Sequence, residues 1–294
     1  MASLPADRAE RALGAQATFC ICFPGSAREA GVRARILRAG FASLQMVPAV
    51  RGTLLSDAEL KAYLTPRAFR TLKQRGARVS GEDVETPGSV GCALSHAACW
   101  RRLVEGPAHW QRATIFEDDA TFAHDGDGRF LQTLHASVQA LETQVDARWE
   151  LLSFGHFSTR QNERATGSPL VHHCVGAFYG ACAYTVTRAG AEKLLQRFFP
   201  ICVQLDGYLG LAAQPHYPER LRAYFTRDKL VRQQSLLNTQ IHGSWAHENP
   251  KLLFPEGRAQ QALLLLFLLV GAMLVYYWGV RRGRRRARAI AYAQ

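Results

Sequence analysis

The chain has 294 residues, of which 48% are apolar, and this length suits one large domain or two modest ones. Its net charge is +12, but six arginines without any acidic neighbour lie in the last fourteen residues, so most of the chain carries an ordinary charge and nucleic-acid binding is not expected. Seven scattered cysteines, an odd number without a CxxC pair, argue against a disulfide framework and predict mostly reduced thiols.

The predicted elements alternate between strand and helix along most of the chain. Polar or glycine-rich stretches at 75–91 and 158–169 are predicted to be loops. In chain order we expect a strand at 18–23, a helix at 27–39, a strand at 44–50, a helix from Ser56, a helix at 92–104, a strand at 113–116, a helix at 130–145, strands at 150–154 and 177–186, and a helix at 189–199. This alternation predicts an α/β domain with a mostly parallel sheet covered by helices on both faces.

A membrane-like segment follows this domain. Residues 259–280 carry no charge and would span about 33 Å as a helix, enough for a bilayer core of about 30 Å. Aromatic residues lie at one end of this segment and the arginine cluster follows, as is typical of a membrane interface. The sequence therefore predicts four regions: a polar N-terminus at 1–17, the main domain at 18–255, a linker and transmembrane anchor at 256–280, and a lipid-contacting arginine tail at 281–294.

The side of the membrane on which the main domain lies stays open. The positive-inside rule places the arginine tail in the cytosol and the domain on the opposite side, which requires an N-terminal signal. Residues 12–23, ALGAQATFCICF, loosely resemble the apolar part of such a signal, although they also suit a strand. Without a signal, a C-terminally anchored chain would keep its domain in the cytosol.

Three carboxylates follow the predicted strand at 113–116. In IFEDDATF (115–122), Glu117 and Asp119 are two residues apart and point to the same side if the backbone is extended. Ligands of open α/β sheets bind beyond the carboxyl ends of strands, and carboxylates there suit Mg²⁺ or Mn²⁺ held together with substrate phosphates. The alternative is that these acidic residues cap a helix or face solvent.

Three runs together resemble glycosyltransferase family 25, which includes lipopolysaccharide-type β-galactosyltransferases and collagen-modifying galactosyltransferases. They are GSVGCALSHAACWRRL (88–103), IFEDDATF (115–122) and GACAYTVTRAGAEKLLQRFFPICVQLDGYLG (180–210). The resemblance extends over residues 18–210. It implies a GT-A fold that binds a nucleotide sugar, commonly UDP-galactose, and transfers the sugar with inversion to a glycan or protein hydroxyl, usually with Mn²⁺ (or Mg²⁺).

The resemblance also implies roles for individual residues. Glu117 and Asp119 correspond to the metal ligands, Asp118 to a ribose contact, and Asp206 to the general base that deprotonates the acceptor hydroxyl. A helix or turn cap is the alternative role of Asp206. Positions matching the donor pocket, including a basic residue facing the diphosphate, are Arg28, Ser95 and His96.

Two positions depart from the family pattern. The first strand typically ends in an Ile-Asn-Leu-like triplet, whereas this chain has Cys22 in the middle position. The second strand usually runs into Ala-Val-Asp-Gly, whereas Arg51 replaces the Asp here, and could meet a phosphate or an acidic sugar instead. Both positions lie where the nucleotide should rest, so a membrane-tethered binding module without catalytic activity is the alternative function.

Other groupings are weaker candidates. Cys92, His96 and Cys99 share one helix face and could suggest zinc, but without a fourth ligand a packing face is favoured. A second Asp-x-Asp at 125–127 lacks the later Glu of a calcium loop and is interpreted as a solvated turn. His242 is a further candidate metal ligand.

Overall fold

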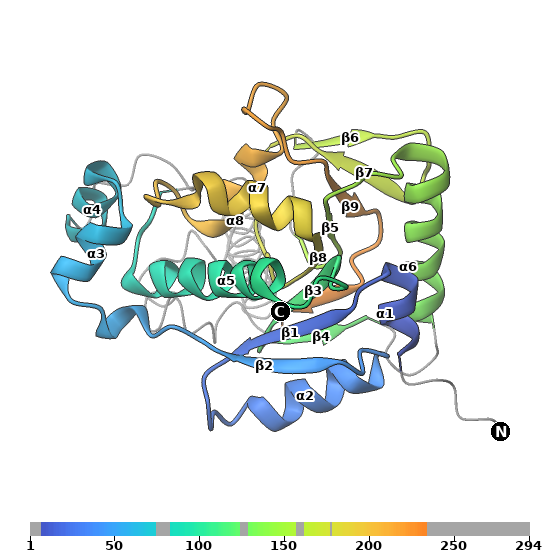
Figure 1. Ribbon diagram of the computed structural model, residues 1–294, viewed down its shortest axis with the longest axis horizontal. Coiled ribbons are helices and arrows are strands. Elements are labelled where there is room, and N and C mark those ends of the chain that lie inside the picture. The colour runs from blue at the N-terminus through green and yellow to red at the C-terminus, as the bar shows by residue number, and fades with distance from the viewer. Residues whose placement is uncertain (1–6, 75–82, 124–128, 157–161, 177, 234–294) are drawn as a thin grey trace, which may run out of the picture. The chain divides into compact units, whose positions relative to one another are not determined.

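The fold is built on an eight-stranded sheet with the strand order β2-β1-β3-β8-β5-β9-β7-β6, and a separate two-stranded sheet pairs β10 with β4 (Figure 1). The computed structural model describes residues 7–74, 83–123, 129–156, 162–176 and 178–233. The strands are β1 (Ala17–Cys22), β2 (Leu44–Pro48), β3 (Arg112–Glu117), β4 (Ala120–Phe122), β5 (Leu151–Ser153), β6 (Glu163–Ala165), β7 (Val171–Cys174), β8 (Ala183–Thr187), β9 (Ala223–Thr226) and β10 (Val231–Gln233).

The large sheet is mixed, whereas the sequence predicted a mostly parallel one. β1 pairs in parallel with β2 and β3, and β5 with β9, but β8 lies antiparallel between β3 and β5. A parallel pair needs a long crossover, usually a helix, and the described residues between β5 and β8 contain no helix. The parallel part, β2-β1-β3, nevertheless brings three carboxyl ends to one edge, where Ile21 pairs with Glu117.

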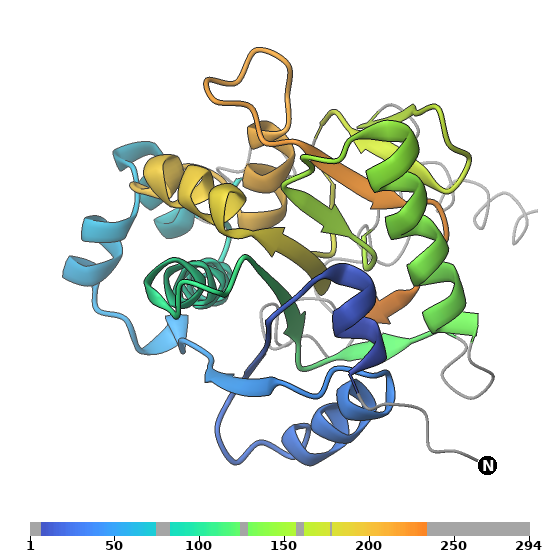
Figure 2. The same ribbon diagram turned by 45° about the vertical axis from the view of Figure 1, so that its right-hand side comes forward.

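Helices cover both faces of the sheet, as predicted. They are α1 (Arg8–Leu13), α2 (Glu29–Arg38), α3 (Asp57–Tyr63), α4 (Pro66–Lys73), α5 (Pro87–Glu105), α6 (Arg129–Ala140), α7 (Arg188–Phe198) and α8 (Leu205–Ala212), with a 3-10 turn η1 (Gly52–Leu54) and a π-helical turn η2 (Leu141–Val145). Phe19 and Ile115 pack in the core with residues of α5, α7 and α8, whereas their neighbours Cys20 and Phe116 pack with residues of α1, α2 and α6. Figure 2 shows α5 and α7 on one side of the sheet and α6 with α1 on the other.

Helix α5 begins five residues before the predicted start. The glycines in 75–91 predicted a loop there, but Thr86 caps the helix by accepting from the backbone N–H of Ser89, and Pro87 occupies the first helical position. The helix start predicted at Ser56 is confirmed, because its side chain and that of Glu59 bond to each other's backbone N–H groups in a capping box.

The N-terminal region belongs to the domain and is not merely a polar segment. Residues 8–13 form α1, in which Ala9 and Leu13 are fully buried and pack in one cluster with residues of α6. Residues 17–22, part of the stretch that loosely resembled a signal, form β1, which pairs with β2 and β3 in the sheet. All seven cysteines are free thiols, five of them buried, which confirms the prediction of reduced cysteines.

The structure corrects the prediction of a transmembrane anchor and of a single-pass membrane protein. Within the described residues, no helix has both the length and the apolar composition needed to cross a bilayer. The longest of them, α5, has 19 residues and carries Arg101, Arg102 and Glu105. The segment 256–280, on which the prediction rested, and the tail 281–294 lie outside the described residues. An uncharged run is a compositional signal and does not by itself establish a spanning helix.

Two glycines allow the backbone after β2 to lie directly against α5. A Cβ on Gly52 would lie 1.6 Å from the carbonyl oxygen of Pro87, and one on Gly91 would lie 2.4 Å from that of Val50. Gly52→Ala is therefore expected to lower the free energy of unfolding by about 3 kcal/mol, measured by urea denaturation. Gly167→Ala is the control, because its Cβ would meet only the Gln144 oxygen at 3.7 Å. Equal stability of the two variants would contradict this close contact.

Candidate functional site

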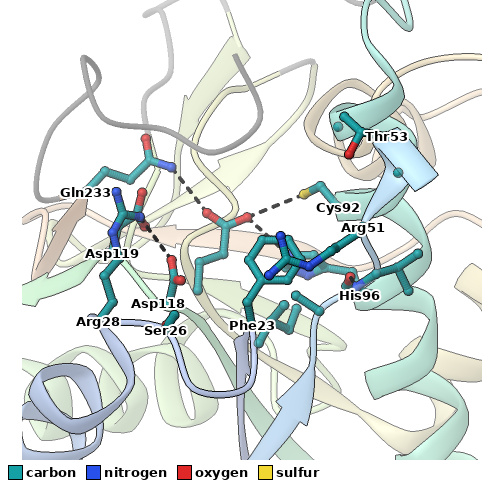
Figure 3. Close-up of a pocket in the computed structure, with 17 residues that line it drawn as sticks. Phe23, Ser26, Arg28, Arg51, Thr53, Cys92, His96, Asp118, Asp119 and Gln233 are labelled. Atoms are coloured by element: carbon teal, nitrogen blue, oxygen red, sulfur yellow. Dashed lines mark hydrogen bonds and ion pairs between the residues drawn. The ribbon is translucent and has the colours of Figure 1, made fainter. Parts of the chain in front are cut away.

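A cavity of about 360 Å³ lies at the carboxyl ends of β1, β2 and β3, beside the N-terminal half of α5 (Figure 3). This is the edge at which ligands of α/β sheets bind. The cavity brings together six of the seven residues that the sequence analysis proposed for the site. They are Arg28, Ser95, His96, Glu117, Asp118 and Asp119.

Glu117 ends β3, and its carboxylate lies at the centre of the cavity's hydrogen bonds. Its Oε1 lies 3.3 Å from His96 Nε2 and 3.5 Å from Cys92 Sγ, and its Oε2 accepts from Gln233 Nε2 at 3.2 Å. Burial alone would raise the pKa of Glu117, but the hydrogen bond to His96, with smaller contributions from Gln233 and Cys92, holds it below its usual value. Glu117 is therefore an anion at neutral pH.

Asp118 is held by a basic side chain that precedes α2. Arg28 Nη1 lies 3.2 Å from Asp118 Oδ1, and the side chains of both residues are largely covered. Burial raises the pKa of Asp118, and the charge of Arg28 opposes that rise. On the other side, Cys22 Sγ lies 3.8 Å from Asp118 Oδ2. The residue of β1 that departs from the family pattern therefore contacts the acidic turn, which consists of Glu117, Asp118 and Asp119.

Asp119 is the carboxylate of the acidic turn whose hydrogen bonding is incomplete. Its side chain is buried, and its Oδ1 has no hydrogen-bond partner among the described residues. Burial, together with the charges of Glu117 and Asp118, raises the pKa of Asp119 to about 7. A buried carboxylate without a partner is costly, and either a proton or a cation would relieve that cost.

The raised pKa of Asp119 predicts how stability depends on pH without metal. The folded protein keeps the Asp119 proton up to about pH 7, whereas the unfolded chain loses it near pH 4, so this contribution is complete below pH 4 and is lost between pH 4 and 7. Asp119→Asn is expected to remove this dependence of stability on pH. At pH 8 the free energy of unfolding of the variant should exceed that of the parent by up to about 4 kcal/mol. Urea denaturation in a chelating buffer from pH 4 to 8 tests this, and parallel profiles would contradict it.

Asp206 is the one predicted site residue that does not line the cavity. It lies in the first turn of α8, and its two oxygens accept from the backbone N–H groups of Gly180 and Ala181 at 2.7 and 3.3 Å. Burial, followed by the charge of Glu117, raises the pKa of Asp206 to about 6. Asp206 thus lies within electrostatic reach of the cavity, but it also ties α8 to the segment that leads into β8.

Ser95 has a structural task in addition to its place in the cavity wall. Its hydroxyl accepts from the backbone N–H of Val50 at 2.8 Å and donates to the Gly91 carbonyl at 2.7 Å. These bonds fasten the backbone after β2 to α5, at the same contact that the two glycines allow. The hydroxyl proton is therefore already used.

Arg51 lies over an aromatic ring in the cavity. Its guanidinium carbon is 4.4 Å from the centre of the Phe23 ring, and among the described residues it has no ion-pair partner. The exposed cation is therefore available to an anionic group of a ligand. Figure 3 shows Arg51 and Phe23 together on the side of the cavity away from Arg28.

The donor atoms of the cavity suit a hard divalent cation at the acidic turn. Glu117 is ionised and Asp119 has an unsatisfied oxygen, and such oxygens are the ligands that Mg²⁺ and Mn²⁺ prefer. Within the described residues, one group of three possible ligands has all its donor atoms within 4.8 Å of one another, namely Cys92, His96 and Glu117. Cys99, which the sequence grouped with two of these, is instead fully buried in the core.

Two contacts that shape the site were not predicted from the sequence. Gln233 ends β10 and reaches Glu117 from the far end of the described chain, and Tyr184 on β8 contacts His96. Neither belongs to a recognisable spacing with its partner, because the contact depends on how the strands pair. The second Asp-x-Asp at 125–127 and His242 lie outside the described residues.

Comparisons with known proteins support the resemblance. The chain is 29% identical over 196 residues to a bovine (Bos taurus) protein named probable inactive glycosyltransferase 25 family member 3, a match that covers 62% of this chain and 29% of that protein. It is 29% identical over 202 residues to the human inactive glycosyltransferase 25 family member 3, covering 64% and 30%. A zebrafish (Danio rerio) procollagen galactosyltransferase 1 is 25% identical over 262 residues, covering 80% of this chain and 41% of the relative. The match thus spans less than half the length of each relative.

The matching family model covers the central part of the site. Residues 85–209 match glycosyltransferase family 25 (LPS biosynthesis protein). This range runs from just before α5 to within α8, and includes the acidic turn and Asp206. The motifs, the family match and the relatives agree, and residues 85–209 are therefore similar to a domain of glycosyltransferase family 25.

Proposed function

We propose that the chain is a metal-dependent glycosyltransferase with a GT-A-like arrangement. It transfers a sugar, with galactose favoured, from a nucleotide-sugar donor to a hydroxyl of a glycan or protein acceptor, with inversion. The observation that carries this proposal is Asp119, a buried carboxylate with an unpartnered oxygen beside the ionised Glu117, in a cavity at the carboxyl ends of parallel strands. Such a site is completed by a divalent cation and the phosphates that accompany it.

The roles of the residues follow from their charges and places. Glu117 and Asp119 would hold Mn²⁺ or Mg²⁺, which when bound supplies positive charge to the departing diphosphate. Arg28, beside Asp118, adds a fixed cation at the same end of the cavity. Asp206, with its pKa raised to about 6, accepts the proton of the acceptor hydroxyl.

A binding module without catalytic activity is the second candidate, and two observations favour it. The names of the bovine and human relatives describe those proteins as inactive or probably inactive. In this chain, Arg51 covers the face of Phe23 inside the cavity, and Cys22 contacts Asp118. These changes alter the surroundings of the proposed donor site and leave the three carboxylates in place.

A donor screen separates the two candidates. The full chain is incubated with UDP-, GDP- and CMP-sugars in the presence of Mn²⁺, while thermal shift reports binding and released nucleotide reports turnover. The proposed enzyme is expected to bind at least one donor and to release its nucleotide, and chelation should abolish the release. Binding without turnover, even with a panel of hydroxyl acceptors, would favour the module, and the absence of both would contradict the proposed donor site.

A further inference from the structure

A buried chain of hydrogen bonds leads from the core to Glu117. Trp100 Nε1 donates to the Tyr184 hydroxyl at 2.9 Å, and this hydroxyl lies 2.8 Å from His96 Nδ1. The opposite ring nitrogen, His96 Nε2, lies 3.3 Å from Glu117 Oε1. Trp100, Tyr184 and His96 are all buried, so solvent does not supply alternative partners.

Helix α5 and strands β8 and β3 hold this series of hydrogen-bonded side chains in place. His96 and Trp100 lie four residues apart on α5, so their side chains share one face of the helix. Tyr184 on β8 pairs with Ile115 of β3, two residues before Glu117, and therefore lies beside the strand that carries the carboxylate. The rings of His96 and Tyr184 are also stacked and nearly parallel, with an angle of 14° between their planes.

Counting donors and acceptors decides which nitrogen of His96 carries the proton. The indole of Trp100 is a donor, so the Tyr184 oxygen accepts from it. The Tyr184 hydroxyl proton then needs an acceptor, and among the described residues His96 Nδ1 is the one within reach. Nδ1 is therefore unprotonated in the neutral ring, and the proton lies on Nε2, where it is donated to Glu117.

We propose that His96 is a positioning residue for the metal-binding carboxylate, locked by Tyr184 in the Nε2–H tautomer. This inference rests on the proposed function for its metal, but the tautomer itself does not depend on it. The bond from Nε2 fixes Oε1 of Glu117, while Gln233 donates to Oε2. Outer groups of this kind orient a ligand and tune its affinity for a metal.

The competing arrangement makes His96 itself a ligand, together with Cys92 and Glu117, whose donor atoms lie within 4.8 Å of one another. His96 would then bind metal through an unprotonated Nε2 and carry its proton on Nδ1. In that case Tyr184 would accept from both Trp100 and His96, and its own hydroxyl proton would be buried without an acceptor. When the proton is on Nε2, the indole of Trp100, the hydroxyl of Tyr184 and both ring nitrogens of His96 all have a hydrogen-bond partner.

The tautomer can be read directly by nitrogen NMR on the full chain with ¹⁵N-labelled histidine, without metal or donor. We expect the His96 ring to show a protonated Nε2 and an unprotonated Nδ1, and His96→Gln identifies the signal by its loss. In Tyr184→Phe the Nδ1 partner disappears, so we expect the signal to move towards a mixture of tautomers. A protonated Nδ1 in the parent would overturn the proposal.

Metal affinity tests the positioning role. Mn²⁺ alone is titrated against the protein and the free ion is followed by electron paramagnetic resonance. Tyr184→Phe is expected to weaken Mn²⁺ binding by about 10- to 100-fold. Tyr208→Phe is the matched control, because its buried hydroxyl donates to the Leu194 carbonyl in the core between α7 and α8. Equal effects of the two variants, each checked by circular dichroism to be folded, would overturn the positioning role.

Two further outcomes keep this inference apart from the proposed function. If the parent binds no Mn²⁺ and transfers no sugar, the proposed function fails, whereas the NMR tautomer still decides the state of His96. Co²⁺ tests direct ligation, because a cobalt–thiolate absorption that disappears in Cys92→Ser would place the metal on the Cys92–His96–Glu117 group. That result would overturn the positioning role, and its absence with bound Co²⁺ supports it.

Discussion

Glu117→Gln is expected to lower sugar transfer by about 100- to 1,000-fold and to abolish most of the Mn²⁺ affinity. Glu117 is the ionised carboxylate of the acidic turn, because hydrogen bonding from His96 outweighs the effect of burial on its pKa. The substitution keeps the shape of the side chain but removes the charge that would hold the cation. Initial rates with the donor found in the screen, and Mn²⁺ titration, measure the two losses.

Variants of the neighbouring acidic residues serve as comparisons. Asp119→Asn is expected to show the same pattern as Glu117→Gln, because Asp119, with its unpartnered oxygen, is the second proposed ligand. Asp127→Ala, in the second Asp-x-Asp, should leave the rate unchanged, since that motif is interpreted as a solvated turn. Equal losses in all three variants would mean that the metal is not held by the turn after β3.

The parts of the site that lie close together in the sequence could be predicted from it. An apolar run that stops at Glu117 predicted a strand end, and β3 does end there. Because β1, β2 and β3 run parallel, their carboxyl ends meet, and Arg28 therefore lies beside Asp118 although 90 residues separate them. A local pattern combined with one rule about parallel sheets was sufficient for the carboxylates, whereas Arg28 was assigned from the family resemblance.

The parts that depend on strand pairing could not be predicted. β8 runs antiparallel between β3 and β5, which brings Tyr184 beside Ile115, and no local pattern in the sequence specifies that order. Gln233 reaches Glu117 from β10, whose three residues carry no periodic signal. Thr86-Pro87-Gly88-Ser89 contains turn-forming residues, and its role as a helix start is visible only in the side-chain bonds of the cap.

The electrostatics of the cavity bear on the choice between enzyme and binding module. A domain without need for a cation would gain stability by losing the charge of Asp119, whose pKa is raised by burial and by two neighbouring carboxylates. The chain keeps all three acidic residues, and it keeps the hydrogen bond that holds Glu117 ionised. Of the two departures, Arg51 lies over Phe23, away from Arg28, and bears on the ligand that the cavity could accept, whereas Cys22 contacts Asp118 and bears on the acidic residues themselves.

Asp206→Asn is expected to lower kcat by about 100- to 10,000-fold while the KM for the donor changes little. Both Asp206 oxygens accept backbone N–H groups, but a carboxylate has about four acceptor positions, so it can still accept the proton of an incoming hydroxyl. Its pKa, raised to about 6 by burial and by Glu117, makes it a better base than an exposed aspartate. Asparagine keeps the size of the side chain but cannot act as this base.

Asp206 also ties α8 to Gly180, so the loss of rate must be separated from a loss of stability. Glu10→Gln is the matched control, because Glu10 is a buried carboxylate that accepts the backbone N–H of Ser43 and lies outside the cavity. Both variants are expected to lower the free energy of unfolding by about 1–3 kcal/mol, but only Asp206→Asn should lower kcat at a temperature where both are folded. If Asp206→Asn lowers stability and leaves kcat unchanged, Asp206 is a structural tether and the base lies elsewhere in the chain.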